Sequence, residues 1–367
     1  MITIAAPIIE GEERQAVNDV MNSGMLAQGP KVAELEAAFA EYCGTKYAIA
    51  VNSGTAAIHA ALHAAGVGAG DEVITTPFSF IATINPILML GAKPVLVDID
   101  PNTFNINVTK IEAAITPKTK AIIPVDLYGQ PCDWDEIRAI ANKHNLKLIE
   151  DACQAVGARY GEEHTGSLGD LGCFSLYATK NIMCGEGGVI TTDNEEYANS
   201  IRAFRQHGMV APYEYEGLGF NYRMTDLHAA IAVEQLKKAD AFTAARQKNA
   251  ELLNERLKDV AGIRLPSVKD GRSHVYHQYT ILLEDAAVSR ELFIERLRDK
   301  GVGAGVYYPK PLHSYPHIAA LGYSLGDYPV AERIAARVVS LPVHPKVSEG
   351  DIEIIATAVQ ESLSATS

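Results

Sequence analysis

Lys180 is the residue whose setting in this sequence most suggests covalent chemistry. It lies in the stretch 172–188, GCFSLYATKNIMCGEGG, between an apolar run and a glycine-rich return that leads into a second apolar run, 189–192. Lysine side chains are mostly exposed, and burial lowers the pKa of a lysine so that its neutral, nucleophilic amine becomes available. Such an amine can form a Schiff base with a carbonyl compound. A solvated surface lysine is the common alternative, so the interpretation depends on what surrounds Lys180.

Two further segments could hold an anion and a basic ring beside this lysine. Ser53, Gly54 and Thr55 lie between an apolar strand and an alanine-rich helix, where free N–H groups and the helix dipole suit a phosphate. Asp151 ends another apolar strand, and a carboxylate there could keep a pyridine nitrogen protonated, which turns the ring into an electron sink. An ordinary helix N-cap, at Ser53 or at Asp151, is the alternative in each case.

Ser175 and Phe80 could complete such a site. Ser175 lies on the strand before Lys180, and its hydroxyl could reach the same phosphate, although a buried serine bonded to the backbone is the alternative. Phe80 follows a strand, and its ring could stack on a flat cofactor. Core packing is the alternative for a single phenylalanine.

The elements that must position these residues alternate between strands and helices. Apolar patterns predict strands at 47–51, 71–75, 94–98, 121–125, 147–150, 173–177 and 189–192, and helices at 10–22, 32–42, 54–65, 78–90, 134–144 and 195–206. Strands that are apolar throughout and alternate with helices indicate a mostly parallel α/β sheet covered by helices on both faces. Sites in such sheets gather at the carboxyl ends of the strands, where the three candidate segments fall.

The C-terminal third has the pattern of a smaller α+β unit. It predicts a long helical region at 225–257, strands at 275–283 and 302–307, and helices at 290–299, 330–339 and 349–363. We therefore expect a large cofactor-binding domain over residues 1–245 and a small C-terminal domain over residues 246–367.

Composition excludes several classes of function. The chain has 367 residues with 47% hydrophobic content, and its net charge of −13 argues against binding to a phosphate backbone as the main task. No basic run suggests a nucleic-acid or membrane surface, and no apolar stretch is long enough to span a bilayer. The five cysteines are scattered without a CxxC pair, which predicts a reducing cytoplasm and no metal site.

Taken together, the motifs resemble those of the DegT/DnrJ/EryC1/StrS family of sugar aminotransferases. The similar segments are SGTAA, GDEVITTPFSFIAT, EDACQA, FSLYATKN with GEGG, HGM and GFNYRM, in that order, and they extend over nearly the whole chain. The family consists of enzymes of the aspartate-aminotransferase-like fold type I that depend on pyridoxal 5'-phosphate (PLP). The resemblance implies that cofactor, that fold and homodimers with shared active sites.

The resemblance also implies individual roles. Lys180 matches the lysine that forms the Schiff base with PLP, and Asp151 matches the partner of the ring nitrogen. Cofactor contacts are implied for the phosphate cradle Gly54, Thr55 and Ser175, for Phe80 over the ring, for Gln154 near the ring hydroxyl, and for Asn221, which reaches the phosphate from the other subunit. Arg223, His313 and His207 match segments near the substrate and are candidates for binding it.

The expected reaction moves an amino group from an amino acid, by family expectation glutamate, to a nucleotide-linked keto-sugar. The segments YGQ and HGM favour position C4 over C3, while the nucleotide, the sugar and the pathway, such as polysaccharide biosynthesis, stay open. Asp126 stands where many relatives have His, which leaves the fine choice of substrate open, and Cys184 stands where Thr is common. Lys180 is retained, whereas family members that perform dehydration or deoxygenation carry His at that position, so the resemblance argues against those chemistries. A cyclitol aminotransferase, a regulatory member that binds without turnover and a plain structural α/β protein are the alternatives.

Overall fold

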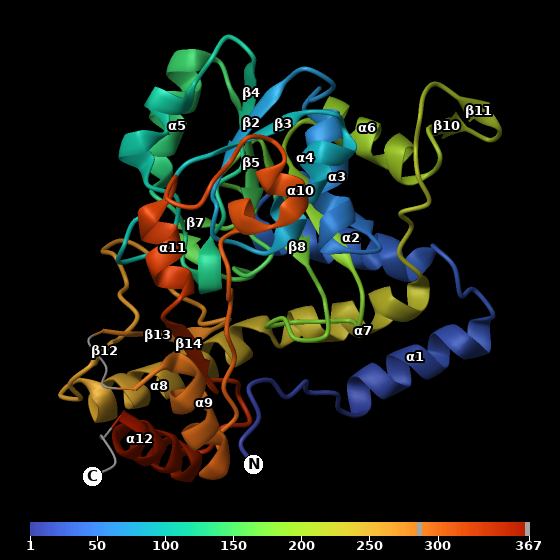
Figure 1. Ribbon diagram of the computed structural model, residues 1–367. Coiled ribbons are helices and arrows are strands. Elements are labelled where there is room, and N and C mark those ends of the chain that lie inside the picture. Colours follow the sequence, from blue (N-terminus) through green and yellow to red (C-terminus); the bar gives the residue numbers. More distant parts are fainter. Residues whose placement is uncertain (285–287, 364–367) are drawn as a thin grey trace.

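The computed structural model describes residues 1–284 and 288–363 and is built around a seven-stranded sheet (Figure 1). The strand order is β1-β9-β8-β5-β4-β2-β3. The strands are β1 (Tyr47–Val51), β2 (Glu72–Thr75), β3 (Lys93–Leu96), β4 (Thr119–Ile122), β5 (Lys147–Asp151), β8 (Leu171–Ser175) and β9 (Gly188–Thr192). β9 pairs antiparallel with both β1 and β8, whereas the pairs from β8 through β5, β4, β2 and β3 are parallel. The predicted mostly parallel sheet is confirmed.

Helices cover both faces of this sheet because successive side chains of its strands point to opposite sides. One face of the sheet, with Ile49 and Ile149, packs against α3 (Gly54–Ala64) and α6 (Glu195–Arg205). The other face packs against three more helices: α2 (Pro30–Cys43), α5 (Trp134–His144) and α7 (Asp226–Lys237). Strands buried on both faces explain the continuous apolar runs in the sequence.

A second, antiparallel sheet lies below the first in Figure 1. It joins β12 (Ile263–Arg264), β13 (Tyr279–Leu283) and β14 (Val338–Leu341), and its core includes α8 (Ala239–Leu257), α9 (Arg290–Asp299) and α12 (Glu349–Leu363). The predicted boundary between residues 245 and 246 falls inside α8, a continuous helix. The division into two domains stays a prediction.

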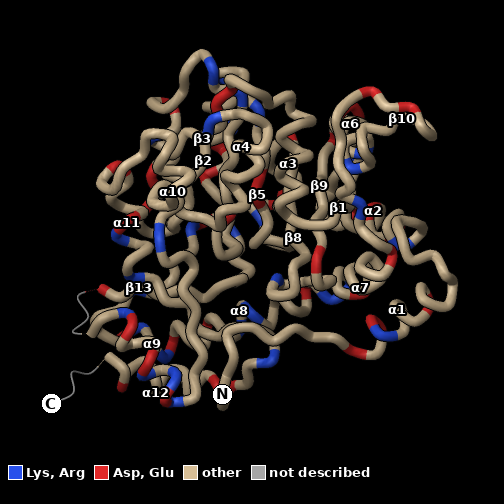
Figure 2. Tube along the Cα trace, turned by 45° about the vertical axis from the view of Figure 1, so that its right-hand side comes forward, with Lys and Arg blue, Asp and Glu red and all other residues tan. Residues whose placement is uncertain are grey.

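The smaller elements connect these layers. They are α1 (Gly11–Ser23), α4 (Asn85–Met89), α10 (Pro316–Ala319), α11 (Pro329–Ala335), the two-stranded ribbons β6 (Arg159–Tyr160) with β7 (Glu163–His164) and β10 (Met209–Ala211) with β11 (Glu214–Tyr215), and 3-10 turns at Ile81–Thr83, Val108–Lys110, Glu112–Ala114, Leu127–Gly129 and Leu312–Ser314. Acidic and basic residues are interspersed along α9, whereas the charged residues of α12 are all acidic (Figure 2). No described helix is both long and apolar enough to cross a membrane.

Three predicted elements are wrong in extent or type. The helix expected at 78–90 is a 3-10 turn followed by α4, because Pro86 lies at the start of α4 and the backbone of Phe80 is extended. The strand expected at 302–307 is reduced to isolated pairings of Val302 with Ile2 and of Gly305 with Ser340. The segment 330–339 divides between α11 and β14. The helical region predicted at 225–257 is confirmed, and it consists of two helices that separate at Lys238.

Two carboxyl groups, those of Asp126 and Glu150, lie fully buried beside the sheet. Asp126 Oδ1 accepts hydrogen bonds from Cys132 N at 2.8 Å and Trp134 Nε1 at 3.3 Å, and its Oδ2 has no hydrogen-bond partner. Burial raises the pKa of Asp126 to about 6. Burial and the neighbouring Asp126 charge also raise the pKa of Glu150 well above 4.5.

Asp126→Asn is expected to stabilise the protein at high pH. An acid whose pKa rises from 3.8 to about 6 on folding binds a proton more tightly in the native state, so stability falls as pH increases through this window. Asparagine keeps the accepting oxygen and carries no charge. Its free energy of unfolding should match the wild type near pH 4 and exceed it by about 2 kcal/mol at pH 8. Denaturant titrations at both pH values measure this, with the exposed Asp299→Asn as control. A difference in unfolding free energy between Asp126→Asn and the wild type that does not change with pH would contradict the raised pKa of Asp126.

Candidate active site

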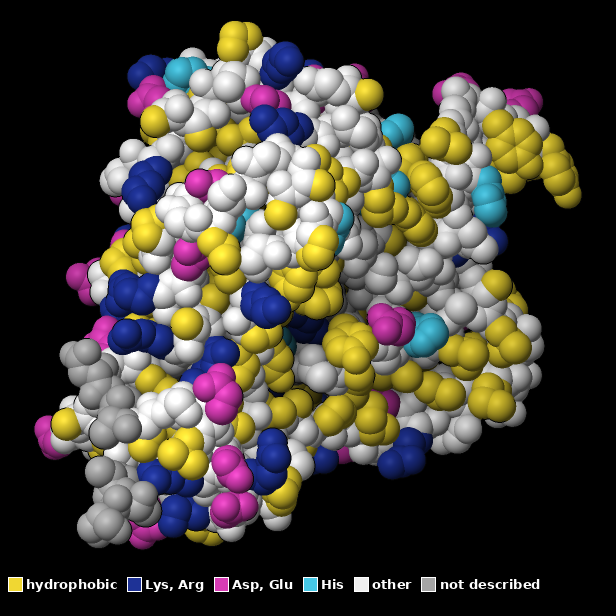
Figure 3. Space-filling view, viewed as in Figure 1, with side chains coloured by type: hydrophobic (Ala, Val, Ile, Leu, Met, Phe, Trp, Pro, Cys, Tyr) yellow, Lys and Arg dark blue, Asp and Glu magenta, His cyan; other side chains and the backbone are white. Residues whose placement is uncertain are grey.

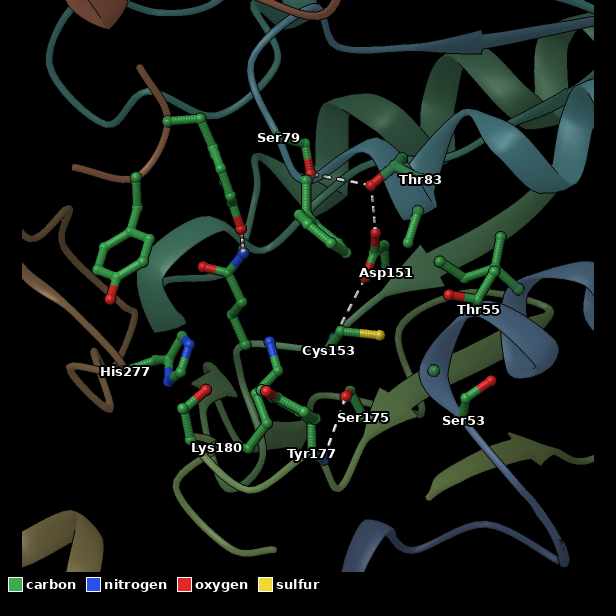
Figure 4. A pocket seen from close by; sticks show the side chains of 18 of the residues that line it. Ser53, Thr55, Ser79, Thr83, Asp151, Cys153, Ser175, Tyr177, Lys180 and His277 are labelled. Carbon is green, nitrogen blue, oxygen red and sulfur yellow. Dashed lines mark hydrogen bonds between the residues drawn. The ribbon is translucent and has the colours of Figure 1, made fainter. Parts of the chain in front are cut away.

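A cavity of about 390 Å³ opens at the carboxyl ends of β1, β2, β5 and β8 (Figure 4). This volume lies within the range of small-molecule pockets, roughly 300–1,000 Å³. Its walls come from segments far apart in the sequence. They include Ser53, Gly54, Thr55, Ser79, Phe80, Thr83, Asp151, Cys153, Gln154, Ser175, Tyr177, Lys180, Glu186, His277, Tyr307 and Tyr308. The three segments that contain Gly54, Asp151 and Lys180 therefore meet at one edge of the sheet, as predicted.

Lys180 lies on a loop that leaves β8 and returns to β9. Backbone bonds hold the two arms of the loop together: Leu176 N donates to Gly187 O at 2.9 Å, and Ala178 N donates to Gly185 O at 3.0 Å. The side chain is only partly exposed and points toward the cavity, and burial lowers the pKa of its amine (Figure 4). A larger fraction of neutral amine is thus available at a given pH than for a surface lysine.

Asp151 ends β5 and faces the cavity from the opposite wall. Its carboxylate is 4% exposed and accepts hydrogen bonds from Thr83 Oγ1 at 2.7 Å and from Cys153 N at 3.2 Å. A turn, not a helix, follows Asp151. The helix N-cap considered as an alternative does not form here, and a carboxylate remains directed at the cavity.

The first turn of α3 provides a site for an anion. Ser53 is the N-cap, and its hydroxyl accepts a hydrogen bond from Ala56 N at 3.1 Å, so the capping alternative holds for this residue. Gly54 and Thr55 follow and line the cavity, together with Ser175. The first N–H groups of a helix lack partners within the helix and attract anions.

Gly54→Ala is expected to weaken binding of a phosphorylated cofactor. A Cβ at this position would lie 2.8 Å from Ser175 Cβ and 3.2 Å from Cys153 Sγ, so the cradle must shift to admit it. Cofactor affinity should fall at least about 10-fold, as expected when one good hydrogen bond to a charged group is lost. Gly11→Ala is the matched control, because Gly11 also begins a helix and a Cβ there meets nothing within 4 Å. Titration with cofactor, followed by absorbance, measures both, and equal affinities would argue against this cradle.

Aromatic and amide groups form the remaining wall. Phe80 is 55% exposed, and its ring centroid lies 5.9 Å from that of Tyr308. Gln154 Nε2 donates to Tyr308 OH at 3.2 Å, while Gln154 Oε1 accepts from Tyr128 N at 2.9 Å. The cavity also contains residues that were not predicted to belong to the site: Ser79, Thr83, Cys153, His277 and Tyr308. Ser79 and Cys153 carried a signal, since each lies within four residues of the end of a predicted strand, whereas Thr83 was predicted to lie inside a helix.

Four predicted site residues lie outside the cavity of this chain. Asn221 and His207 are exposed, and Arg223 pairs through its backbone with Val51. His313 is fully buried, and its Nε2 lies 2.9 Å from Glu332 Oε1. One chain by itself therefore brings together Gly54, Thr55, Phe80, Asp151, Gln154, Ser175 and Lys180 but not the remaining four.

The donor set fits a phosphorylated aldehyde with a basic ring. An amine with lowered pKa, a buried carboxylate and a helix N-terminus line one cavity, and these are the groups that would bind an aldehyde carbon, a ring nitrogen and a phosphate. The described residues contain no cluster of histidine, cysteine and acidic side chains that could hold a metal ion, and all five cysteines are free.

Comparison with known proteins gives one consistent result. The sequence profile of the DegT/DnrJ/EryC1/StrS aminotransferase family matches residues 7–360. GDP-perosamine synthase from Caulobacter vibrioides is 41% identical over 99% of this chain and 98% of its own. The structure of DesV from S. venezuelae is 34% identical and covers 97% of this chain and 95% of its own, with a TM-score of 0.93. The PLP form of the putative sugar aminotransferase Spr1654 from Streptococcus pneumoniae is 29% identical, covers 98% of both chains and has a TM-score of 0.93.

Proposed function

Because this chain belongs to the DegT/DnrJ/EryC1/StrS aminotransferase family, we propose that it transfers an amino group from glutamate to a nucleotide-linked keto-sugar. The chain is a PLP-dependent aminotransferase of fold type I, as the sequence resemblance predicted. The observation that carries the proposal is the single cavity in which Lys180, Asp151 and the first turn of α3 face one another.

PLP, when bound, supplies an electron sink through which nitrogen can pass between an amino acid and a ketone. We assign its phosphate to Gly54, Thr55 and Ser175, its ring nitrogen to Asp151, and its aldehyde carbon to Lys180. Because burial lowers its pKa, the Lys180 amine is suited to hold the cofactor and then to carry a proton at the reacting carbon. Asp151 keeps a positive charge on the ring nitrogen by pairing with it. Phe80, at the cavity wall, restricts the tilt of the ring.

The acceptor class is proposed from the relatives. GDP-perosamine synthase, at 41% identity over nearly the full length, bears the name of an enzyme that produces a nucleotide-linked amino sugar. We propose position C4 for amination from the segments YGQ and HGM, although Gln130 is buried and His207 lies outside the cavity of one chain. A cyclitol acceptor and a binding function without turnover are the competing proposals.

We further propose that two copies assemble with shared active sites. Lys180 is the only cationic side chain among the described residues that line the cavity, so one chain offers little to balance the charges of a nucleotide diphosphate. The ribbon β10–β11 projects from the body, and apolar side chains gather on it in Figure 3. Tyr213 and Tyr215 are exposed on the ribbon, and Leu218 is exposed just after it. Asn221 lies close by in the chain and pairs with Gln206, which precedes β10. A second copy would cover this surface and could bring Asn221 to the phosphate.

The free cysteines support a reducing, cytoplasmic setting.

An absorbance experiment tests the proposed reaction in two steps. Purified protein with PLP should show the near-visible band of bound cofactor, and glutamate should remove this band by converting the cofactor to its amine form. A panel of nucleotide keto-sugars and keto-inositols is then added, and the compound that restores the band is the acceptor. If only a keto-inositol restores the band, the acceptor is a cyclitol and not a nucleotide-linked sugar. PLP binding without a response to any amino acid would favour the binding function.

A further inference from the structure

Two hydroxyl groups outside the predicted set of site residues are connected to Asp151. Thr83 Oγ1 lies 2.7 Å from Asp151 Oδ2, and Ser79 Oγ lies 2.9 Å from Thr83 Oγ1. None of the three side chains is more than 4% exposed. Figure 4 shows them in sequence along one wall of the cavity, with dashed lines joining Ser79 to Thr83 and Thr83 to Asp151.

The local fold explains how both hydroxyl groups reach this wall. The chain bends at residues 77–79, and Phe80, with an extended backbone, leads into the short 3-10 turn Ile81–Thr83 instead of a regular helix. This shape brings Ser79 and Thr83, four residues apart, within hydrogen-bond distance. The departure from the predicted helix therefore places Ser79, Phe80 and Thr83 on the same cavity.

The direction of this hydrogen-bond chain follows from the chemistry of its last member. An ionised carboxylate can only accept, so the hydroxyl hydrogen of Thr83 points to Asp151 Oδ2. The Thr83 oxygen can then accept from Ser79, whose hydroxyl donates. With Ser79 donating to Thr83 and Thr83 donating to Asp151, each of the three groups has a hydrogen-bond partner.

The hydroxyl chain restricts how the carboxylate can turn. The terminal torsion of aspartate is intrinsically broad, so neighbours decide its orientation. Thr83 engages Oδ2, and Cys153 N engages Oδ1 at 3.2 Å, which fixes the carboxylate plane from two sides. Each carboxylate oxygen has more than one acceptor site, so capacity remains for a ring N–H in the cavity.

We propose that Thr83 is a positioning residue for the reaction, oriented by Ser79, and that it holds the Asp151 carboxylate toward the ring nitrogen of PLP. The proposal rests on the cofactor role assigned above to Asp151. Thr83 acts through Asp151 and need not touch the cofactor. Without it, the carboxylate keeps its charge but loses its fixed orientation, and the ring nitrogen holds its proton less firmly.

The test uses the holoenzyme loaded with PLP that carries ¹⁵N in its ring. The nitrogen resonance, followed against pH by solid-state NMR, should report a protonated ring in the wild type. In Thr83→Val the ring nitrogen should lose its proton at a lower pH than in the wild type, and its resonance should move toward the unprotonated value there. PLP affinity should fall about 10- to 100-fold, the range for a hydrogen bond to a charged group. Thr83→Ser retains the hydroxyl and should restore both readouts, while Ser79→Ala should move them in the same direction by less.

Thr75→Val is the matched control. Thr75 is a buried threonine whose Oγ1 donates to Ile123 O at 2.9 Å, and it does not line the cavity. Equal changes of the nitrogen resonance and of PLP affinity in Thr75→Val and Thr83→Val would mean that the loss of any buried hydroxyl has this effect, and would overturn the proposal. A wild-type resonance and affinity in Thr83→Val and Ser79→Ala would also overturn it. An unprotonated ring in the wild type would instead remove the role assigned to Asp151, so the two failures are distinguishable.

Discussion

Lys180→Ala is expected to reduce turnover by at least about 10⁴-fold, because covalent holding of the cofactor and proton transfer would both be lost. No neighbouring group can replace this amine, since Lys180 is the only cationic side chain among the described residues that line the cavity. Steady-state turnover of the amino donor and acceptor measures the loss. The absorbance of added PLP should stay close to that of the free aldehyde and not show the band of enzyme-bound cofactor.

Two further variants separate this chemical effect from a general loss of charge. Lys180→Arg retains a cation, but its guanidinium cannot be deprotonated in proteins, so turnover should stay lost. Lys46→Ala removes an exposed lysine and should leave turnover within about twofold of wild type, as is usual for surface changes. A small primary amine added to Lys180→Ala should restore part of the activity by taking over the proton transfer. Normal turnover without added amine would refute the assigned role.

The sequence predicted this part of the site because each member is tied to the end of a strand. Each of three residues, Lys180, Asp151 and Gly54, lies at or shortly after the end of an apolar run. Such runs are typical of buried parallel strands, and parallel strands of one sheet end at a common edge. Their convergence follows from the topology and needs no knowledge of side-chain packing. The resemblance to a family then gave each residue a role.

The rest of the site depends on tertiary packing that no local pattern encodes. Tyr308 reaches the cavity from the position directly after a segment that was predicted to be a strand. His277 was predicted to lie on a strand, and it reaches the cavity from the segment before β13. Thr83 was assigned to a regular helix, and only the extended backbone before the 3-10 turn brings its hydroxyl to Asp151. Asn221 shows a different limit, because its predicted partner lies in another copy of the chain.

Asp151→Asn is expected to lower kcat by about 10³-fold, the second largest effect on this reaction. The amide is nearly isosteric, so its oxygen can still accept a hydrogen bond from Thr83, but it carries no charge to hold a proton on the ring nitrogen. Without that proton the ring withdraws electrons poorly, and the step that removes a carbon-bound proton becomes slow. Single-turnover absorbance measurements with an amino donor isolate this step. PLP affinity should change much less than the rate.

Glu150→Gln makes the same chemical change one residue earlier and on the opposite face of the same strand. Glu150 is fully buried and accepts hydrogen bonds from Gly166 N at 2.8 Å and Leu168 N at 3.2 Å, away from the cavity lining. Because burial already raises its pKa, a neutral side chain suits this position. The amide oxygen can keep one of the two hydrogen bonds but the NH2 group cannot accept the other, so the loss should fall on stability while the rate stays within a few-fold of wild type. Equal losses in the two variants would mean that the rate responds to any neutral substitution in β5. A loss confined to Asp151→Asn requires a carboxylate that acts from the cavity face.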